Sequence, residues 1–144
     1  MPSGLFVLAA RRGDEEEAML ASWVMQAGFE PPMISIALRK DRPLAEWLAD
    51  GTPFILNVLA DDQLSTVRHF SHRRDGAGAL AGLPLERTAA GLPVLAGAVG
   101  HLECQPAGKI DSGDHHVFLA SVLSGHLGPA ARPLVHIRKN GLKY

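Results

Sequence analysis

The sequence has a single cysteine, no long hydrophobic run and almost no net charge. Because Cys104 has no second cysteine to pair with, an intrachain disulfide is excluded, and this agrees with a reducing compartment. No apolar stretch reaches the roughly 18 residues of a membrane-spanning helix, and the N-terminus lacks a charged segment followed by an apolar one. We therefore expect a cytoplasmic protein without a membrane partner.

The motifs of several large enzyme classes are also missing. No Gly-x-Gly-x-x-Gly opens a helix, so a Rossmann nicotinamide site is not expected. The chain carries no Ser-His-Asp elbow, phosphate loop or zinc signature, which argues against hydrolases, nucleotide triphosphatases and metalloproteases. The formal net charge is -1 and the cations stand in short groups among acids, which argues against a nucleic-acid partner.

What the sequence does contain is a succession of strand patterns. With 144 residues, 47% of them apolar, the chain is expected to form one domain over residues 1–144 with a buried core. Strands are predicted over residues 5–9, from about 17, and over 33–38, 54–59, 94–105, 115–123 and 134–137. Turns are expected at residues 11–14 and 106–108. So many neighbouring strands with two helices favour an antiparallel barrel over a doubly wound sheet.

The two helices are predicted from their end signals. Pro43 suits the first turn of a helix over 43–50, and Gly51 can close it. A second helix over 62–71 has Asp61 as its candidate cap. The apolar side of that helix is expected to carry Leu64, Val67 and Phe70. Residues 73–93 are rich in glycine and alanine, and we expect a long excursion there with one short helix.

The block from Met19 to Leu38 is the most informative part of the chain. It predicts two strands joined by a Pro31-Pro32 turn, followed by the cationic loop Arg39-Lys40-Asp41-Arg42. The two faces of the first strand carry Met19, Ala21 and Trp23 against Leu20, Ser22 and Val24. A flat apolar ledge beside a phosphate-attracting turn suits a flavin mononucleotide (FMN). The structural alternatives are a half-buried strand and a solvated turn.

Four other polar or reactive residues call for an interpretation. Asn57 lies inside an apolar strand and is expected to satisfy a turn or backbone group, with cofactor contact as the alternative. Cys104 is expected in the core rather than as a nucleophile. His69 and His72 are three residues apart on a predicted helix, but no acidic or cysteine partner completes a metal site, so helix-surface positions are expected.

Together with Gly113-Asp114-His115 and the segments 91–95 and 102–104, the block resembles the flavin reductase-like family of FMN-binding split barrels. It is most similar to the modules at the C-terminal end of some flavodiiron proteins. The resemblance covers nearly the whole chain and implies a mainly β fold with short helices, a split β-barrel. Relatives often have a helix before the first strand, whereas in this chain the first predicted strand begins directly at Leu5. We therefore expect a dimer partner to cover the end of the barrel.

The resemblance also implies roles for individual residues. His115 is the expected catalytic residue, linked to nicotinamide binding, and Asp114 could fix its tautomer. No metal is implied. The phosphate contacts fall on the cationic loop, with Arg42 and Lys40 as the candidates that neutralise the phosphate and the start of the Pro43 helix adding partial positive charge. The expected cofactor-binding residues are Leu20, Ala21, Ser22, Trp23, Val24, Leu38, Arg39, Lys40 and Arg42.

By this resemblance the protein is expected to be an NAD(P)H-dependent flavin reductase. Hydride would pass from NADH or NADPH to N5 of FMN, with FAD as the alternative flavin, and electrons would go on to free flavin, an oxygenase, iron or dioxygen. A homodimer with the flavin near the subunit interface is expected. Two alternatives remain open: an FMN-binding electron-transfer module reduced by a partner protein, and a non-catalytic cofactor-binding module.

Overall fold

The computed structural model describes residues 2–71, 78–129 and 132–137. The strands are β1 Ser3–Gly4, β2 Phe6–Arg12, β3 Glu15–Ala21, β4 Val24–Phe29, β5 Pro32–Arg39, β6 Phe54–Val58, β7 Leu85–Arg87, β8 Pro93–Leu95, β9 Gly100–Ser112, β10 His115–Leu127 and β11 Val135–His136. The helices are α1 Pro43–Ala49 and α2 Leu64–Ser71. The predicted mainly β class with two short helices is therefore confirmed.

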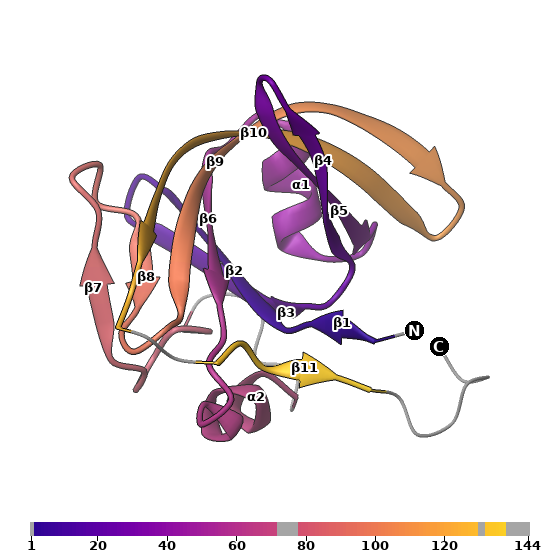
Figure 1. Ribbon diagram of the computed structural model, residues 1–144. Coiled ribbons are helices and arrows are strands. Elements are labelled where there is room, and N and C mark those ends of the chain that lie inside the picture. The colour runs from indigo at the N-terminus through magenta and orange to yellow at the C-terminus, as the bar shows by residue number, and fades with distance from the viewer. Residues whose placement is uncertain (1, 72–77, 130–131, 138–144) are drawn as a thin grey trace.

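Seven strands form one strongly curved sheet in the order β3-β2-β6-β9-β10-β5-β4, and every neighbouring pair is antiparallel (Figure 1). Small two-stranded ladders, β1 with β11 and β7 with β8, lie beside it. The edge strands β3 and β4 are consecutive in the chain, and no ladder among the described residues joins them. The sheet is thus an antiparallel barrel left open between β3 and β4.

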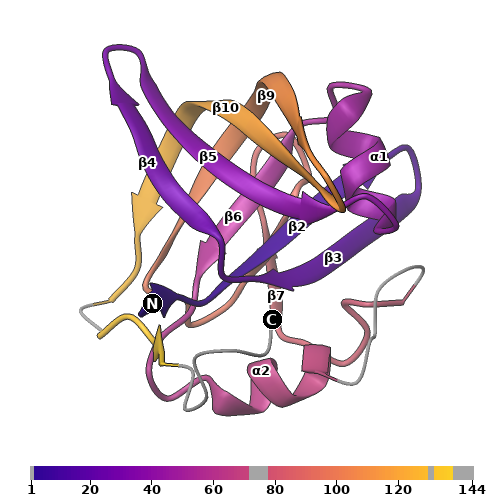
Figure 2. The same ribbon diagram turned by 90° about the vertical axis from the view of Figure 1, so that its right-hand side faces the viewer.

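The predicted strand through Met19–Val24 is wrong at its end. β3 stops at Ala21, the chain bends at Ser22 and Trp23, and β4 starts at Val24 (Figure 2). Because the bend shifts the alternation by one residue, Val24 packs on the same core as Met19 and Ala21, and the Trp23 side chain is 41% exposed. The second strand and its proline turn are confirmed, since β4 pairs with β5.

The turn predicted at residues 11–14 is confirmed, because the chain reverses there between β2 and β3, whereas the turn predicted at residues 106–108 is wrong. Residues 106–108 do not form a turn: β9 continues through them with a register shift at Ala107, and the chain reverses at Gly113 and Asp114 instead. Gly113 has a φ of +80°, a conformation that costs glycine little. The predicted strand 94–105 is interrupted by a turn between β8 and β9. Within the described residues 78–93 there is a strand of the β7–β8 hairpin instead of the predicted short helix.

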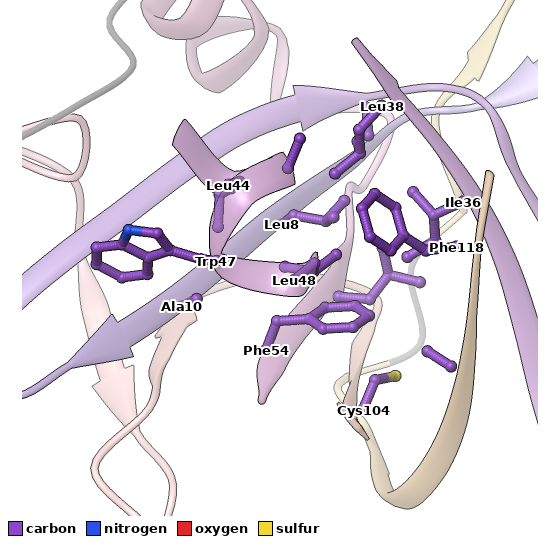
Figure 3. Packing of buried hydrophobic residues seen from close by; sticks show 14 of the residues in the cluster. Leu8, Ala10, Ile36, Leu38, Leu44, Trp47, Leu48, Phe54, Cys104 and Phe118 are labelled. Atoms are coloured by element: carbon purple, nitrogen blue, oxygen red, sulfur yellow. The ribbon is translucent and has the colours of Figure 1, made fainter. Parts of the chain in front are cut away.

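Helix α1 is confirmed and fills the concave side of the sheet. Pro43 stands in its first turn and Gly51, with a φ of +81°, follows its end. Its buried face of Leu44, Ala45, Trp47 and Leu48 meets a core drawn from all parts of the sheet (Figure 3). That core includes Leu8, Ile36, Phe54, Cys104 and Phe118. Each large apolar side chain buried there contributes roughly 1.5–3 kcal/mol.

Helix α2 covers the opposite side of the sheet. It begins at Leu64, later than predicted, so Gln63 rather than Asp61 precedes its first turn. Phe70 is buried and Val67 packs against the same cluster as predicted, but Leu64 is 51% exposed. Phe70 therefore belongs to this second core, which explains its burial without a ligand.

Asn57 has the structural role that its position in an apolar strand predicts. Its fully buried amide donates from Nδ2 to the Val7 carbonyl (3.1 Å) and accepts at Oδ1 from the Leu95 N–H (2.9 Å). It thereby ties β8 to the main sheet.

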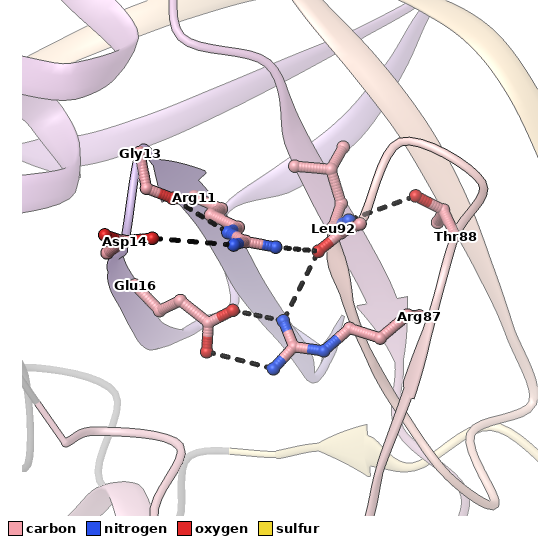
Figure 4. A network of polar contacts seen from close by, with 8 residues as sticks. Arg11, Gly13, Asp14, Glu16, Arg87, Thr88 and Leu92 are labelled. Atoms are coloured by element: carbon pink, nitrogen blue, oxygen red, sulfur yellow. Dashed lines mark hydrogen bonds and ion pairs between the residues drawn. The ribbon is translucent and has the colours of Figure 1, made fainter.

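A surface network of polar contacts holds the same two parts together (Figure 4). Arg87 of β7 pairs with Glu16 of β3, and the guanidinium groups of Arg11 and Arg87 both donate to the Gly91 carbonyl. The β7–β8 hairpin is thus fastened to the β2–β3 hairpin.

Candidate functional site

A cavity of about 470 Å³ opens where the end of β3, the end of β5 and the start of β10 converge. Its volume lies in the range of small-molecule sites, roughly 300–1,000 Å³. It is lined by Met19, Leu20, Ala21, Ser22, Trp23, Ala37, Leu38, Arg39, Arg42, Asp114 and His115. All the predicted site residues except Val24 and Lys40 belong to this set.

The apolar wall of the cavity comes from an edge strand. β3 pairs with β2 on one side, and among the described ladders no strand pairs with its other side. An edge strand presents N–H and C=O groups outward at alternate residues. The edge of β3 at Leu20 and Ala21 therefore offers backbone groups that can bind the polar edge of a ring, and Leu38 of β5 lines the same cavity.

The cations of the loop after β5 have different surroundings. Lys40 Nζ lies 2.6 Å from Oδ2 of Asp111 on β9, and this contact, with a hydrogen bond from the Gly113 N–H, holds the pKa of Asp111 below its usual value. Lys40 is thus engaged on the β9 side and does not line the cavity. Arg42 lines it and is half-buried, whereas Lys40 is exposed.

Asp41 stands between these cations, but it faces one of them. Its Oδ2 lies 2.6 Å from Nη2 of Arg39, and no side chain caps helix α1. The Arg39 charge is therefore partly neutralised within the loop. Of the three cations in the loop, Arg39 and Arg42 line the cavity, and Arg42 is the more buried of the two.

His115 is held on two sides. Its Nδ1 lies 2.8 Å from Oδ1 of Asp114, and its ring faces Trp23 with 4.8 Å between centroids and planes 31° apart. The hydrogen bond from His115 lowers the pKa of Asp114, so this group is a carboxylate at neutral pH and can only accept. This contact favours the tautomer that carries the proton on Nδ1. His116 points to the other face, toward Phe118.

A second cavity of about 370 Å³ lies on the other side of Trp23. It shares Ser22, Trp23 and Ala37 with the first and contains the predicted Val24. Its lining adds Pro2, Ser3, Met25, Ser35, Val117 and His136. The sequence carries no signal for His136, because pairing between β1 and β11 brings it here.

Neither Cys104 nor His69 lines the first cavity. Cys104 is fully buried, and burial raises the pKa of its thiol to about 12, which confirms a core residue. His69 Nε2 contacts the Ala79 carbonyl at 2.7 Å, while His72 lies outside the described residues. No group of three metal-ligating residues occurs in the part of the chain that the structure describes. Nor does this part contain a helix long and apolar enough to cross a membrane.

The residues of the first cavity fit a flavin nucleotide. The apolar wall suits the ring system, the outer edge of β3 suits its polar edge, and Arg42 with Arg39 suits a phosphate.

Comparisons with known proteins agree with this fit. The family model described as flavin reductase like domain matches residues 1–141. Diflavin flavoprotein A 1 of Synechocystis sp. is 35% identical over 98% of this chain. The match covers 25% of that protein, and this chain spans about a quarter of the length of the curated relatives that it matches.

Solved structures show the same similarity. The NADH:FAD oxidoreductase SgcE6 of Streptomyces globisporus has a TM-score of 0.85 and 26% identity, covering 100% of this chain and 84% of that one. BorF, the flavin reductase component of a bacterial two-component tryptophan halogenase, has a TM-score of 0.84 and 25% identity, covering 94% of this chain and 86% of that one. With a family match over nearly all of its residues, the chain belongs to the flavin reductase like domain family.

Proposed function

We propose that this domain is an NAD(P)H:flavin oxidoreductase that binds FMN in the cavity between β3, β5 and β10. The observation that carries the proposal is the convergence of an apolar edge strand, the half-buried Arg42 and the oriented His115 on one cavity. The comparisons support it: SgcE6 is an NADH:FAD oxidoreductase, and a second structure of it contains NAD and FAD fragments. FAD is therefore the alternative flavin.

In this proposal the residues of the chain bind and orient the flavin and the nicotinamide. The bound flavin would supply the redox chemistry, which is the acceptance of hydride from the nicotinamide at N5. The segment Leu20–Trp23 and Leu38 line the ring, and Arg42, with a smaller share from Arg39, binds the phosphate. Lys40 serves instead to fasten the loop to β9 through Asp111. Val24 lines the second cavity and not the first. His115 presents Nε2 to the first cavity, because Nδ1 is occupied by Asp114.

A homodimer is part of the proposal. The edge strand β4 exposes Met25 (72%) and Phe29 (82%), and β10 exposes Leu123 (59%) and Leu127 (81%). Exposed apolar side chains on an unpaired edge favour burial against another chain. A second copy on β4 would also border the second cavity, which Met25 lines. Sedimentation of the wild type against Phe29→Glu measures this: a dimer that the substitution dissociates is expected, and a wild-type monomer contradicts it.

The direct test mixes FMN-loaded protein with NADH, and separately NADPH, in the absence of oxygen, and follows the oxidised flavin absorbance. Bleaching faster than that of free FMN is expected, and the faster nucleotide identifies the donor. Unchanged absorbance with FMN still bound contradicts the proposal.

One observation favours a second candidate. The chain matches only about a quarter of the diflavin flavoproteins, so a module of this kind also occurs within longer chains. The domain would then relay electrons between its FMN and a neighbouring redox protein. This candidate is selected if a protein donor reduces the bound FMN and neither NADH nor NADPH does. In either case an acceptor such as an oxygenase, and a cytoplasmic location, remain part of the proposal.

A further inference from the structure

The contact between Trp23 and His115 joins two distant parts of the chain. Trp23 lies in the bend between β3 and β4, and His115 is the first residue of β10. Their ring centroids are 4.8 Å apart with planes tilted by 31°. This is within the separation of attractive aromatic pairs, about 4.5–7 Å. The indole therefore forms a surface against which the imidazole rests.

Both partners in this contact are fixed by the backbone. The Ala37 N–H of β5 donates to the Trp23 carbonyl at 3.0 Å, although Trp23 itself belongs to no strand. On the other side, the Lys40 N–H donates to the Asp114 carbonyl at 3.1 Å and anchors the turn that precedes β10. The two rings meet because β5 positions the segments that carry them.

A single hydrogen bond does not orient the imidazole fully. The Asp114 side chain is 83% exposed and belongs to a two-residue turn, whereas the His115 side chain is 17% exposed. With only the Nδ1–H···Oδ1 bond, the ring could still rotate about that bond. The face contact with Trp23 removes this freedom, because the ring cannot turn without losing its contact with the indole.

We propose that Trp23 is a positioning residue for His115, which holds the imidazole so that Nε2 faces the first cavity. The inference rests on the proposed function, in which His115 presents Nε2 to the first cavity. Trp23 also lines both cavities. In this proposal its main effect on the reaction passes through the orientation of His115 and not through ligand affinity.

The first experiment uses flavin-free protein, so it is independent of activity. The His115 ring protons and the Nδ1 proton are observed by NMR in the wild type, Trp23→Leu and Trp23→Phe. We expect Trp23→Leu to abolish the ring-current shift and to speed exchange of the Nδ1 proton with water, and Trp23→Phe to restore slow exchange in part. Trp47→Phe, which removes the buried indole of α1 that takes no part in this contact, is the matched control and should leave the His115 signals unchanged. Equal Nδ1 exchange in Trp23→Leu and the wild type overturns the proposal.

The second experiment is a double-mutant cycle on the rate of flavin bleaching at saturating FMN and NADH. Trp23→Leu is expected to lower the rate on the order of tenfold in the wild-type background, since a displaced catalytic group costs up to about 100-fold. In a His115→Ala background the same substitution should have almost no further effect, because the group that it positions is gone. Equal losses in both backgrounds mean that Trp23 acts on the ligands directly, which overturns the inference.

A wild type that does not bleach with either nucleotide is a failure of the proposed function. It also ends the claim that Trp23 serves this reaction, while the Nδ1 exchange still reports whether the indole holds the ring. The two failures are therefore distinguishable.

Discussion

The two loop cations Arg42 and Lys40 allow a sharp prediction, because they are close in sequence but differ in surroundings. Arg42 is half-buried and lines the cavity, whereas exposed Lys40 is engaged with Asp111. A hydrogen bond to a charged group is worth about 1.5–3 kcal/mol. Since each 1.4 kcal/mol corresponds to a factor of ten, Arg42→Ala is expected to raise the Kd for FMN by about 10- to 150-fold. Lys40→Ala should leave it nearly unchanged.

The neighbouring pair extends the same reasoning. Arg39 is exposed and lies 2.6 Å from Asp41, so its net pull on a phosphate is that of a surface charge, about 0–1 kcal/mol. Arg39→Ala should therefore weaken FMN binding by no more than about fivefold. Asp41→Asn releases the Arg39 charge and removes a nearby anion, so it should tighten FMN binding.

The assay is an equilibrium titration of flavin fluorescence at low and high salt, with FMN and with riboflavin. Riboflavin lacks the phosphate and is the matched ligand control, so its Kd should be the same in Arg42→Ala and the wild type. The FMN effect of Arg39→Ala should shrink at high salt because exposed charges are screened, whereas the effect of Arg42→Ala should shrink less because Arg42 is half-buried. Equal loss of FMN affinity in Arg42→Ala and Lys40→Ala, or an equal loss of riboflavin affinity, would refute this reasoning.

Four further predictions concern stability and reactivity. Asn57→Ala leaves the Leu95 N–H without its acceptor and removes the donor to the Val7 carbonyl. Urea unfolding should therefore show that the free energy of unfolding falls by about 2–5 kcal/mol. A fall smaller than that expected for a single hydrogen bond contradicts the buried network. Cys104 should resist thiol reagents at about pH 8 until the protein unfolds, and reaction in the native state would contradict its burial. Because the folded pKa of this thiol lies above its ordinary value of 9.0, the unfolding free energy should fall as pH rises above 9, and less so in Cys104→Ala. Glu16→Gln, at a partly exposed pair with Arg87, should lower the free energy of unfolding by no more than about 1 kcal/mol, as measured by thermal unfolding.

Features that depend on near neighbours in the chain could be predicted from the sequence. Pro43 and Gly51 marked the ends of α1, and the alternation of residues 33–38 marked β5. The isolated polar side chain of Asn57 within an apolar strand correctly indicated a backbone partner. Each of these follows from local backbone restrictions or from the two-residue period of a strand.

The errors came where a local pattern was compatible with two tertiary arrangements. Apolar alternation continued through Ser22 and Trp23, but the sheet must bend there to carry the chain from one edge to the other. Pro106 and Gly108 looked like a turn, yet β10 pairs along this segment and turns it into a bulge. The pairing partner decided the outcome in both cases.

The sequence by itself determined a mainly antiparallel fold, the ends of α1 and the segments that build the cavity. Only the tertiary structure decided which side chains enter that cavity. In the tertiary structure Lys40 pairs with Asp111, Arg42 lines the cavity, and the Trp23 ring contacts the His115 ring. The physical reason is that residue types and spacing set backbone geometry over a few residues, whereas the direction and charge partners of a side chain depend on strand register and on segments far away in the chain.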